Sequence, residues 1–290
     1  FYFLFNQQNL LENSGRIISS EINNMKEYRI ISYKMSQKGN FDKISGIQSD
    51  EAPRDYLSQN IIRSRETIAE VHNRLKFHKI QWKENYNALF IDYENLQKEN
   101  ELLIEYLTQL GDEEAGIYAK LNQAASDFRS KYQHASSGIS SVSSFEKIFT
   151  IVELLKNHRD ENLIYEVQEK IDEIFEQLNH QNPDSSNYMI ARVGDALGGV
   201  KLAFQEYARK LFEIGLSSEK GLTQKLNDRY DKIDYRLKTS LDLIYAERSA
   251  RNLSSFVFLV VLILILLAFN IGSFYFYSKR ESGFKRLKHG

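Results

Sequence analysis

The chain has few side chains whose type and spacing could perform catalysis. It contains no cysteine, which excludes thiolate nucleophiles, disulfides and thiolate metal sites, and its six histidines lack metal-binding spacing. Gly111 and Gly116 are spaced like the glycines of a phosphate-binding loop, but no Lys-Ser/Thr pair follows them. Neither an HExxH nor a GxSxG motif occurs. The sequence therefore indicates no catalytic residue, no metal site and no cofactor, and we expect this polypeptide not to be an enzyme.

A small-molecule site would draw on aromatic side chains and on two arginines. His78, Trp82 and Tyr86 are four residues apart and would form an aromatic ridge on one face of a helix, where core packing is the alternative. Arg63 and Arg192 flank apolar stripes, and a guanidinium can donate two parallel hydrogen bonds to a carboxylate. The alternative for both arginines is an interfacial side chain that reaches water. The candidate ligand-binding residues are Arg63, His78, Trp82 and Arg192.

Two stretches of the sequence resemble each other. Residues 107–122 are LTQLGDEEAGIYAKLN, and residues 211–227 are LFEIGLSSEKGLTQKLN. With one gap, Gly111 aligns with Gly215, Gly116 aligns with Gly221, and a Lys-Leu-Asn triplet ends both. Because glycine commonly ends a helix, we expect each glycine pair at a hairpin between antiparallel helices. A true repeat would mean two related helical modules, and chance similarity between two helix ends is the alternative.

Apolar residues recur at helical spacing along most of the chain, and no alternating strand pattern of useful length occurs. The pattern predicts a helix at about 7–36, a loop at 37–54, and further helices from residue 112 to residue 244. Its clearest part is a seven-residue repeat that predicts one helix over 55–110, about 80 Å long at 1.5 Å per residue. The repeat comprises Ile61, Ile68, Leu75, Trp82, Leu89, Leu96, Leu103 and Leu110.

The second position of this repeat is mixed, since Val71 is apolar but Asn85 and Asp92 are polar. A two-stranded coiled coil prefers both positions apolar, whereas a long helix in a bundle tolerates polar residues there. The fold class is therefore predicted as all-α, an elongated up-and-down bundle of about six helices that share one core.

A long apolar stretch follows the last amphipathic helix. No charge occurs between Arg251 and Lys279, and residues 256–269 are apolar without interruption. About 20 such residues span a hydrocarbon core of about 30 Å. Residues 252–278 are therefore predicted as a transmembrane helix that continues the preceding helix without a proline or glycine break.

Charge and the first residues suggest the arrangement around the membrane. Residues 279–290 carry five basic residues and one acidic residue, which leaves −5 for the rest of a chain with net charge −1. A basic segment beside a span marks the cytoplasmic side, and a domain of −5 is a poor candidate for nucleic-acid binding. Residues 1–6, beginning FYFLF, are predicted as the end of a truncated first transmembrane helix, with a buried strand or a signal peptide as alternatives.

The predicted organisation thus has four parts. Residues 1–6 end a first span, residues 7–251 form an extracytoplasmic domain with modules at about 7–138 and 139–251, residues 252–278 span the membrane, and residues 279–290 are a truncated cytoplasmic segment.

Two helical modules between two spans, each with the recurring glycine motif at Gly111–Gly116 and Gly215–Gly221, resemble the helical bimodular sensor domains. These belong to bacterial chemoreceptors and sensor histidine kinases, including the kinase that senses trimethylamine N-oxide. The resemblance covers about residues 7–278. It implies two four-helix bundles stacked along shared long helices, a homodimer in the bacterial inner membrane, and signalling through the second span. It also implies binding of a small organic ligand or of a periplasmic binding protein. The chain departs from the family in the loop at 37–54 and in the length of the helix at 55–110, and no ligand residue can be carried over.

The expected function is therefore sensing, by the extracytoplasmic domain of a two-component histidine kinase or of a chemotaxis receptor. The output, which in a histidine kinase would be an enzyme, lies outside the sequence. The alternative function is a tail-anchored coiled-coil tether or fusion protein without a ligand, which would place residues 7–251 in the cytoplasm.

Overall fold

The computed structural model describes residues 2–37, 53–75, 80–111, 115–135, 142–157, 160–181, 188–216 and 220–288. These residues form eight α-helices and no strand, so the fold is all-α, as the sequence predicts. The helices are α1 (Tyr2–Gln37), α2 (Pro53–Leu75), α3 (Ile80–Leu110), α4 (Gly116–Ala135), α5 (Val142–Asn157), α6 (Glu161–Gln181), α7 (Tyr188–Ile214) and α8 (Gly221–Lys288).

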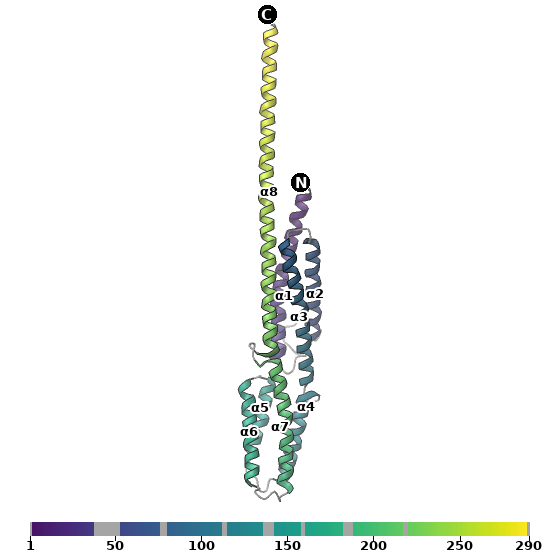
Figure 1. Ribbon diagram of the computed structural model, residues 1–290, viewed down its shortest axis with the longest axis vertical. Helices are drawn as coiled ribbons and strands as arrows, with labels where there is room; N and C mark the ends of the chain where they lie inside the picture. Colours follow the sequence, from purple (N-terminus) through teal and green to yellow (C-terminus); the bar gives the residue numbers. More distant parts are fainter. Residues whose placement is uncertain are drawn as a thin grey trace.

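The helices pack as two groups of four that are stacked end to end (Figure 1). The upper bundle consists of α1, α2, α3 and the first part of α8, and the lower bundle consists of α4, α5, α6 and α7. In the upper bundle both α8 and α2 pack against α1 and α3. In the lower bundle α7 packs against α4 and α6, and α5 packs against α6. This grouping interleaves the sequence, since α8 joins α1–α3 although the predicted modules at 7–138 and 139–251 would separate them.

Two composite helices run through both bundles. Figure 1 shows that α4 continues the direction of α3, and that α8 continues the direction of α7. The two composites lie antiparallel, because α3 packs on α8 in the upper bundle and α4 packs on α7 in the lower one. The described residues form eight helices, where the sequence predicts about six.

The four glycines of the repeated motif lie at the two junctions between collinear helices. All four have positive φ: 71° at Gly111, 87° at Gly116, 97° at Gly215 and 64° at Gly221. Gly111 and Gly215 end their helices by donating a backbone hydrogen bond to Leu107 and Leu211 respectively. The predicted helix ends are therefore present, but the predicted hairpins are wrong. The chain leaves the helix at the first glycine and restarts beside it, so the direction is kept.

The single helix predicted over 55–110 is also wrong, because α2 ends at Leu75, α3 begins at Ile80 and the two pack side by side. The stacked rings of His72 and Tyr86, whose centroids are 3.6 Å apart, join the two helices. Both helices bury their seven-residue stripe, with Ile68 and Leu96 fully buried. A seven-residue repeat that keeps its phase from one helix into the next looks the same in sequence as one unbroken helix.

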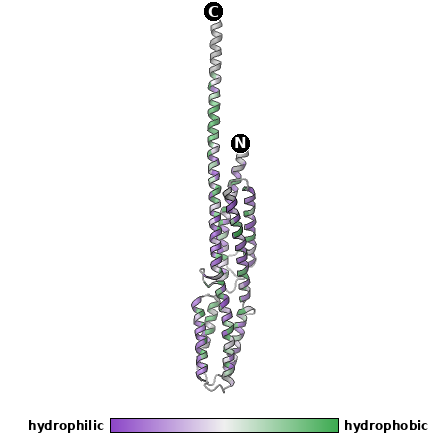
Figure 2. Cartoon of the chain, in the orientation of Figure 1, coloured by the Kyte–Doolittle hydropathy of each residue, from purple (hydrophilic) through white to green (hydrophobic). Residues whose placement is uncertain are grey.

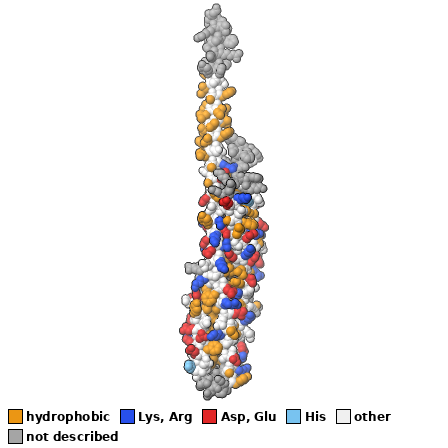
Figure 3. Space-filling model, in the orientation of Figure 1, with side chains coloured by type: hydrophobic (Ala, Val, Ile, Leu, Met, Phe, Trp, Pro, Cys, Tyr) orange, Lys and Arg blue, Asp and Glu red, His pale blue; other side chains and the backbone are white. Residues whose placement is uncertain are grey.

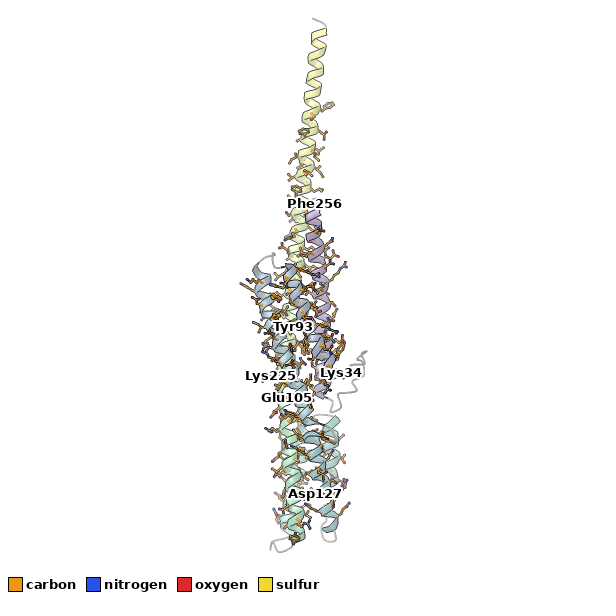
Figure 4. All side chains as sticks on the ribbon, turned by 90° about the vertical axis from the view of Figure 1, so that its right-hand side faces the viewer. Lys34, Tyr93, Glu105, Asp127, Lys225 and Phe256 are labelled. Atoms are coloured by element: carbon orange, nitrogen blue, oxygen red, sulfur yellow. The ribbon has the colours of Figure 1, made fainter. Side chains whose placement is uncertain are left out.

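The remaining stripes form a core that continues through both bundles. Tyr93 lies inside the upper bundle in the side view of Figure 4, whereas Phe256 lies level with the N-terminal end of α1. The loop predicted at 37–54 falls largely outside the described residues. The structure places residues 2–6 in α1 and residues 279–288 in α8, and it describes no side chain of 2–5 or 275–288.

Alanine at Gly111 or Gly215 is expected to destabilise the protein by about 1–3 kcal/mol, the usual cost of forcing a side chain into a left-handed conformation. A Cβ at Gly111 would lie 2.0 Å from the carbonyl oxygen of Ala115, and a Cβ at Gly215 would lie 1.9 Å from that of Lys220. Chemical denaturation of the full chain in detergent, followed by circular dichroism, measures the loss.

Gly199→Ala is the matched control, because a Cβ at this position of α7 meets nothing within 4 Å. Alanine is a better helix former than glycine, so this variant is expected to be as stable as the parent or more stable. Equal stability for all three variants would contradict the junction geometry.

Candidate functional site

The final helix, α8, joins the upper bundle to the apolar stretch without a break. It runs from Gly221 to Lys288 as one helix. Its apolar part stands clear of both bundles (Figure 2), and the exposed side chains there include Phe256, Leu266 and Phe269. Figure 3 shows hydrophobic side chains around this part, while charged side chains cover the bundles below it. Among the described residues α8 is the one helix that is long and apolar enough to cross a membrane.

A charged network attaches α8 to α3. The carboxylate of Asp92, on α3, accepts hydrogen bonds from Arg229 Nη1 at 2.7 Å and from Arg236 Nε at 2.6 Å. Arg229 also pairs with Glu99, with Nη2 and Oε1 3.1 Å apart. The side chain of Asp92 is only 7% exposed, so the network lies partly inside the bundle, where Coulomb attraction is less screened.

One step further toward the apolar part, Asn85 extends this contact. Its Nδ2 donates to the backbone oxygen of Arg236 at 3.0 Å and to Ser240 Oγ at 2.6 Å. Asn85, Asp92 and Glu99 are seven residues apart on α3, so all three present their polar groups to the same face of α8. The polar positions that disfavour a coiled coil in the sequence are therefore the positions that bind α8.

Polar contacts also attach α8 to α1. Arg29 donates from Nε to Asn227 Oδ1 at 3.1 Å and from Nη1 to Asp231 Oδ1 at 2.6 Å. Closer to the apolar part, Arg248 pairs with Glu12 at 3.0 Å. These pairs are half exposed, and each contributes at most about 1 kcal/mol. Together with the Asp92 network, they define the antiparallel register of α8 against two neighbours.

The interior of the upper bundle contains a second polar cluster. Ser32 Oγ, on α1, donates to Asn100 Oδ1 on α3 at 2.8 Å and lies 2.7 Å from the hydroxyl of Tyr230 on α8. Asn100 Nδ2 donates to the carbonyl oxygen of Leu96 at 2.9 Å. Ser32, Asn100 and Tyr230 are all buried, and this shared hydrogen bonding ties three helices together in the core.

The same core contains a buried carboxyl group. Glu21, on α1, is 6% exposed, and its Oε1 accepts a hydrogen bond from Asn24 at 3.2 Å. Burial raises the pKa of the Glu21 carboxyl, although hydrogen bonds from Ser64 and Asn24 favour the charged form. Burial also raises the pKa of Tyr28 to about 12 and that of Tyr93 well above its ordinary value. Among the described residues, Glu21 Oε2 and the Tyr93 hydroxyl have no hydrogen-bond partner.

Of the four predicted ligand residues, the structure describes the side chains of Arg63 and Arg192, which lie in different bundles. Arg63 is exposed on α2 in the upper bundle, and Arg192 is exposed on α7 in the lower bundle, where its guanidinium lies 5.6 Å from the ring centre of Tyr188. His78 lies outside the described residues, and the side chain of Trp82 is not described although its backbone belongs to α3. The glycines are brought together in pairs, since a Cβ on Gly111 would lie 2.7 Å from Gly116 Cα.

The sequence interpretation did not identify the interior cluster. One signal was available: Ser14, Glu21, Tyr28 and Met35 are seven residues apart on α1 and all four are buried. A glutamate at a core position of a heptad is unusual and indicates a specific role.

Comparison with protein-family models, with curated proteins and with solved structures finds no match for this chain. The fold and the contacts of α8 define its class, an all-α bundle protein with an exposed apolar helix of membrane-spanning length.

Asp92→Asn is expected to destabilise the protein by about 2 kcal/mol or more, because it leaves two partly buried guanidinium groups without their shared carboxylate. Glu101→Gln is the control on the same helix, since Glu101 is exposed and accepts a hydrogen bond only from Gln97 among the described contacts. Its effect should stay within about 0.5 kcal/mol. Urea denaturation of both variants makes the comparison, and similar losses would show that the Asp92 network does not hold α8.

Proposed function

We propose that this chain is the sensing part of a bacterial transmembrane receptor, in which α8 carries the signal from the helical domain into the membrane. The observation that carries the proposal is the continuity of α8. Between residues 227 and 248, hydrogen bonds and ion pairs join α8 to α1 and α3, and the same helix then continues as the exposed apolar segment. A displacement of α8 within the upper bundle therefore moves its apolar segment as well, because no break separates the two parts.

The mechanism is a shift between two packings of the bundle. A ligand or partner that binds one packing more tightly increases its population by the ratio of the two affinities. The network around Asp92 joins α8 to α3 through discrete hydrogen bonds. A change in its partners would therefore move α8 between defined positions.

Three features support the resemblance to helical bimodular sensor domains. The helices form two stacked groups of four, two composite helices are shared by both groups, and the repeated glycine motif marks both junctions. The N-terminal end of α1 lies at the same end of the upper bundle as the apolar part of α8 (Figure 1), which suits a domain held between two spans. The receptor is then a homodimer in the inner membrane that binds a small organic ligand or a periplasmic binding protein.

Thiol labelling tests the proposed topology, because the chain has no cysteine and a single introduced one reports its own position. Tyr235→Cys lies on an exposed face of α8 within the upper bundle, since Tyr235 is 71% exposed. Ser282→Cys lies beyond the apolar segment. A membrane-impermeant maleimide is expected to label the first variant in intact cells and the second only after the inner membrane is opened.

The cysteine-free parent is the control and should take up no label. The reverse pattern, with Ser282→Cys labelled in intact cells, would contradict the receptor topology. That reverse pattern is the one that a tail-anchored tether requires, because its span places residues 7–251 in the cytoplasm and Ser282 on the opposite side. If neither position is labelled before lysis, α8 does not cross the inner membrane, which would contradict both functions.

Thermal-shift screening tests the proposed ligand class. Organic acids, amino acids and amine oxides are added to the detergent-solubilised chain, and a true ligand at 100 times its Kd is expected to stabilise it by about 2.7 kcal/mol. For a protein of this size that corresponds to a Tm increase of several degrees. If no compound raises the Tm, direct sensing of these classes is contradicted, and a binding protein becomes the expected input.

A further inference from the structure

We propose that Glu21 is a proton-binding site in the core of the upper bundle, through which the packing of α1, α2, α3 and α8 responds to pH. The proposal goes beyond the proposed sensing function and does not depend on it, because it concerns the protonation and the stability of the bundle itself.

The position of Glu21 carries the argument. Its side chain is 6% exposed in a heptad position otherwise used for core packing, between Ser14 and Tyr28. Its Oε1 accepts a hydrogen bond from Asn24, on the same helix. Its Oε2 has no partner within the described part of the chain. A buried carboxylate with an unsatisfied oxygen is costly, and protonation removes that charge.

The groups that face Glu21 from the neighbouring helices are neutral at ordinary pH. Tyr28 lies on α1 itself, Ser64 on α2 and Tyr93 on α3. Tyr93 is fully buried, and its hydroxyl also has no hydrogen-bond partner among the described residues. A proton on Glu21 Oε2 would turn this oxygen into a donor, and the phenol oxygen of Tyr93 is an acceptor in the same core.

Charged groups on α8, which packs against α1, and on α1 itself have other partners. On α8, Arg236 is bound to Asp92 and Lys238 is bound to Asp234. On α1, Glu27 accepts a hydrogen bond from Tyr56 of α2 at 3.0 Å. None of these charged groups is paired with Glu21 in the described part of the chain, and protonation removes the cost of its buried charge.

The sign of the pH effect follows from the direction of the pKa shift. Burial raises the pKa of Glu21 in the folded protein above its ordinary value of 4.5. The folded state therefore holds the proton more tightly than the unfolded state. The stability that Glu21 contributes is fully present below pH 4.5 and is lost as the pH rises through the raised pKa. The upper bundle is expected to be tighter in mild acid and looser at higher pH.

Glu21→Gln tests the inference, because glutamine has the same shape and cannot ionise. The full chain in nanodiscs is heated at several pH values between about 4 and about 8. Exposed carboxyl groups begin to ionise at the low end of this range and are fully ionised at the high end. We expect the Tm of the variant and the wild type to agree at the low end. At the high end the Tm of the variant should be about 2–4 °C higher than that of the wild type. This is the change in Tm that about 1 kcal/mol of stability produces in a domain of roughly this size.

Glu66→Gln is the matched control, since Glu66 is exposed on α2 and its variant should follow the wild type at every pH. Infrared spectroscopy of the wild type adds a second measurement that does not need the variant to fold. It should show the C=O band of a protonated carboxyl group that persists above the pH at which exposed carboxyl groups ionise. A Tm difference that does not change with pH, or the absence of this band, would overturn the proposal.

Discussion

The antiparallel pairing of the composite helices α3–α4 and α7–α8 is the constraint on which the rest of the structure depends. These two rods are the only elements that belong to both bundles of the described chain, while α1, α2, α5 and α6 each belong to one. The junctions must therefore keep each rod straight where the core passes from one bundle to the other. Positive φ at all four junction glycines provides this, because the chain can leave the helix and restart beside it.

Polar contacts, rather than apolar ones, define how α8 sits in the upper bundle. Leucine and isoleucine side chains pack adequately in several registers, since dispersion contacts are numerous and individually weak. The ion pairs of Asp92 with Arg229 and Arg236 allow far fewer registers, because each carboxylate oxygen has its own donor. Such a network adds little net stability after desolvation, and its role here is to select one register. A helix that transmits small displacements needs this selection more than it needs additional stability.

The sequence was sufficient for the fold class, the apolar stripes and the long exposed segment of α8, because each depends on local periodicity. It was insufficient to predict whether consecutive helices run in the same direction or reverse. The repeat that includes Ile68, Leu75 and Leu89 keeps its phase from α2 into α3, so periodicity alone predicts one helix. The glycines show the opposite error. Gly111 and Gly215 end helices as predicted, but whether the next helix reverses depends on packing against distant segments, which local sequence does not encode.

The polar interior shows a further limit of sequence reading, and also what could have been recognised. Asn85 and Asp92 were visible as exceptions in an apolar seam, yet their partners Arg236 and Ser240 lie about 150 positions away in the chain. Glu21 was equally visible as an exception on α1. An acidic residue in a core position has either a basic partner, as Asp92 does, or a shifted pKa, as Glu21 does. Only the three-dimensional structure shows which of the two applies. It distinguishes Asp92, which fixes the position of α8 through its ion pairs, from Glu21, which can take up a proton.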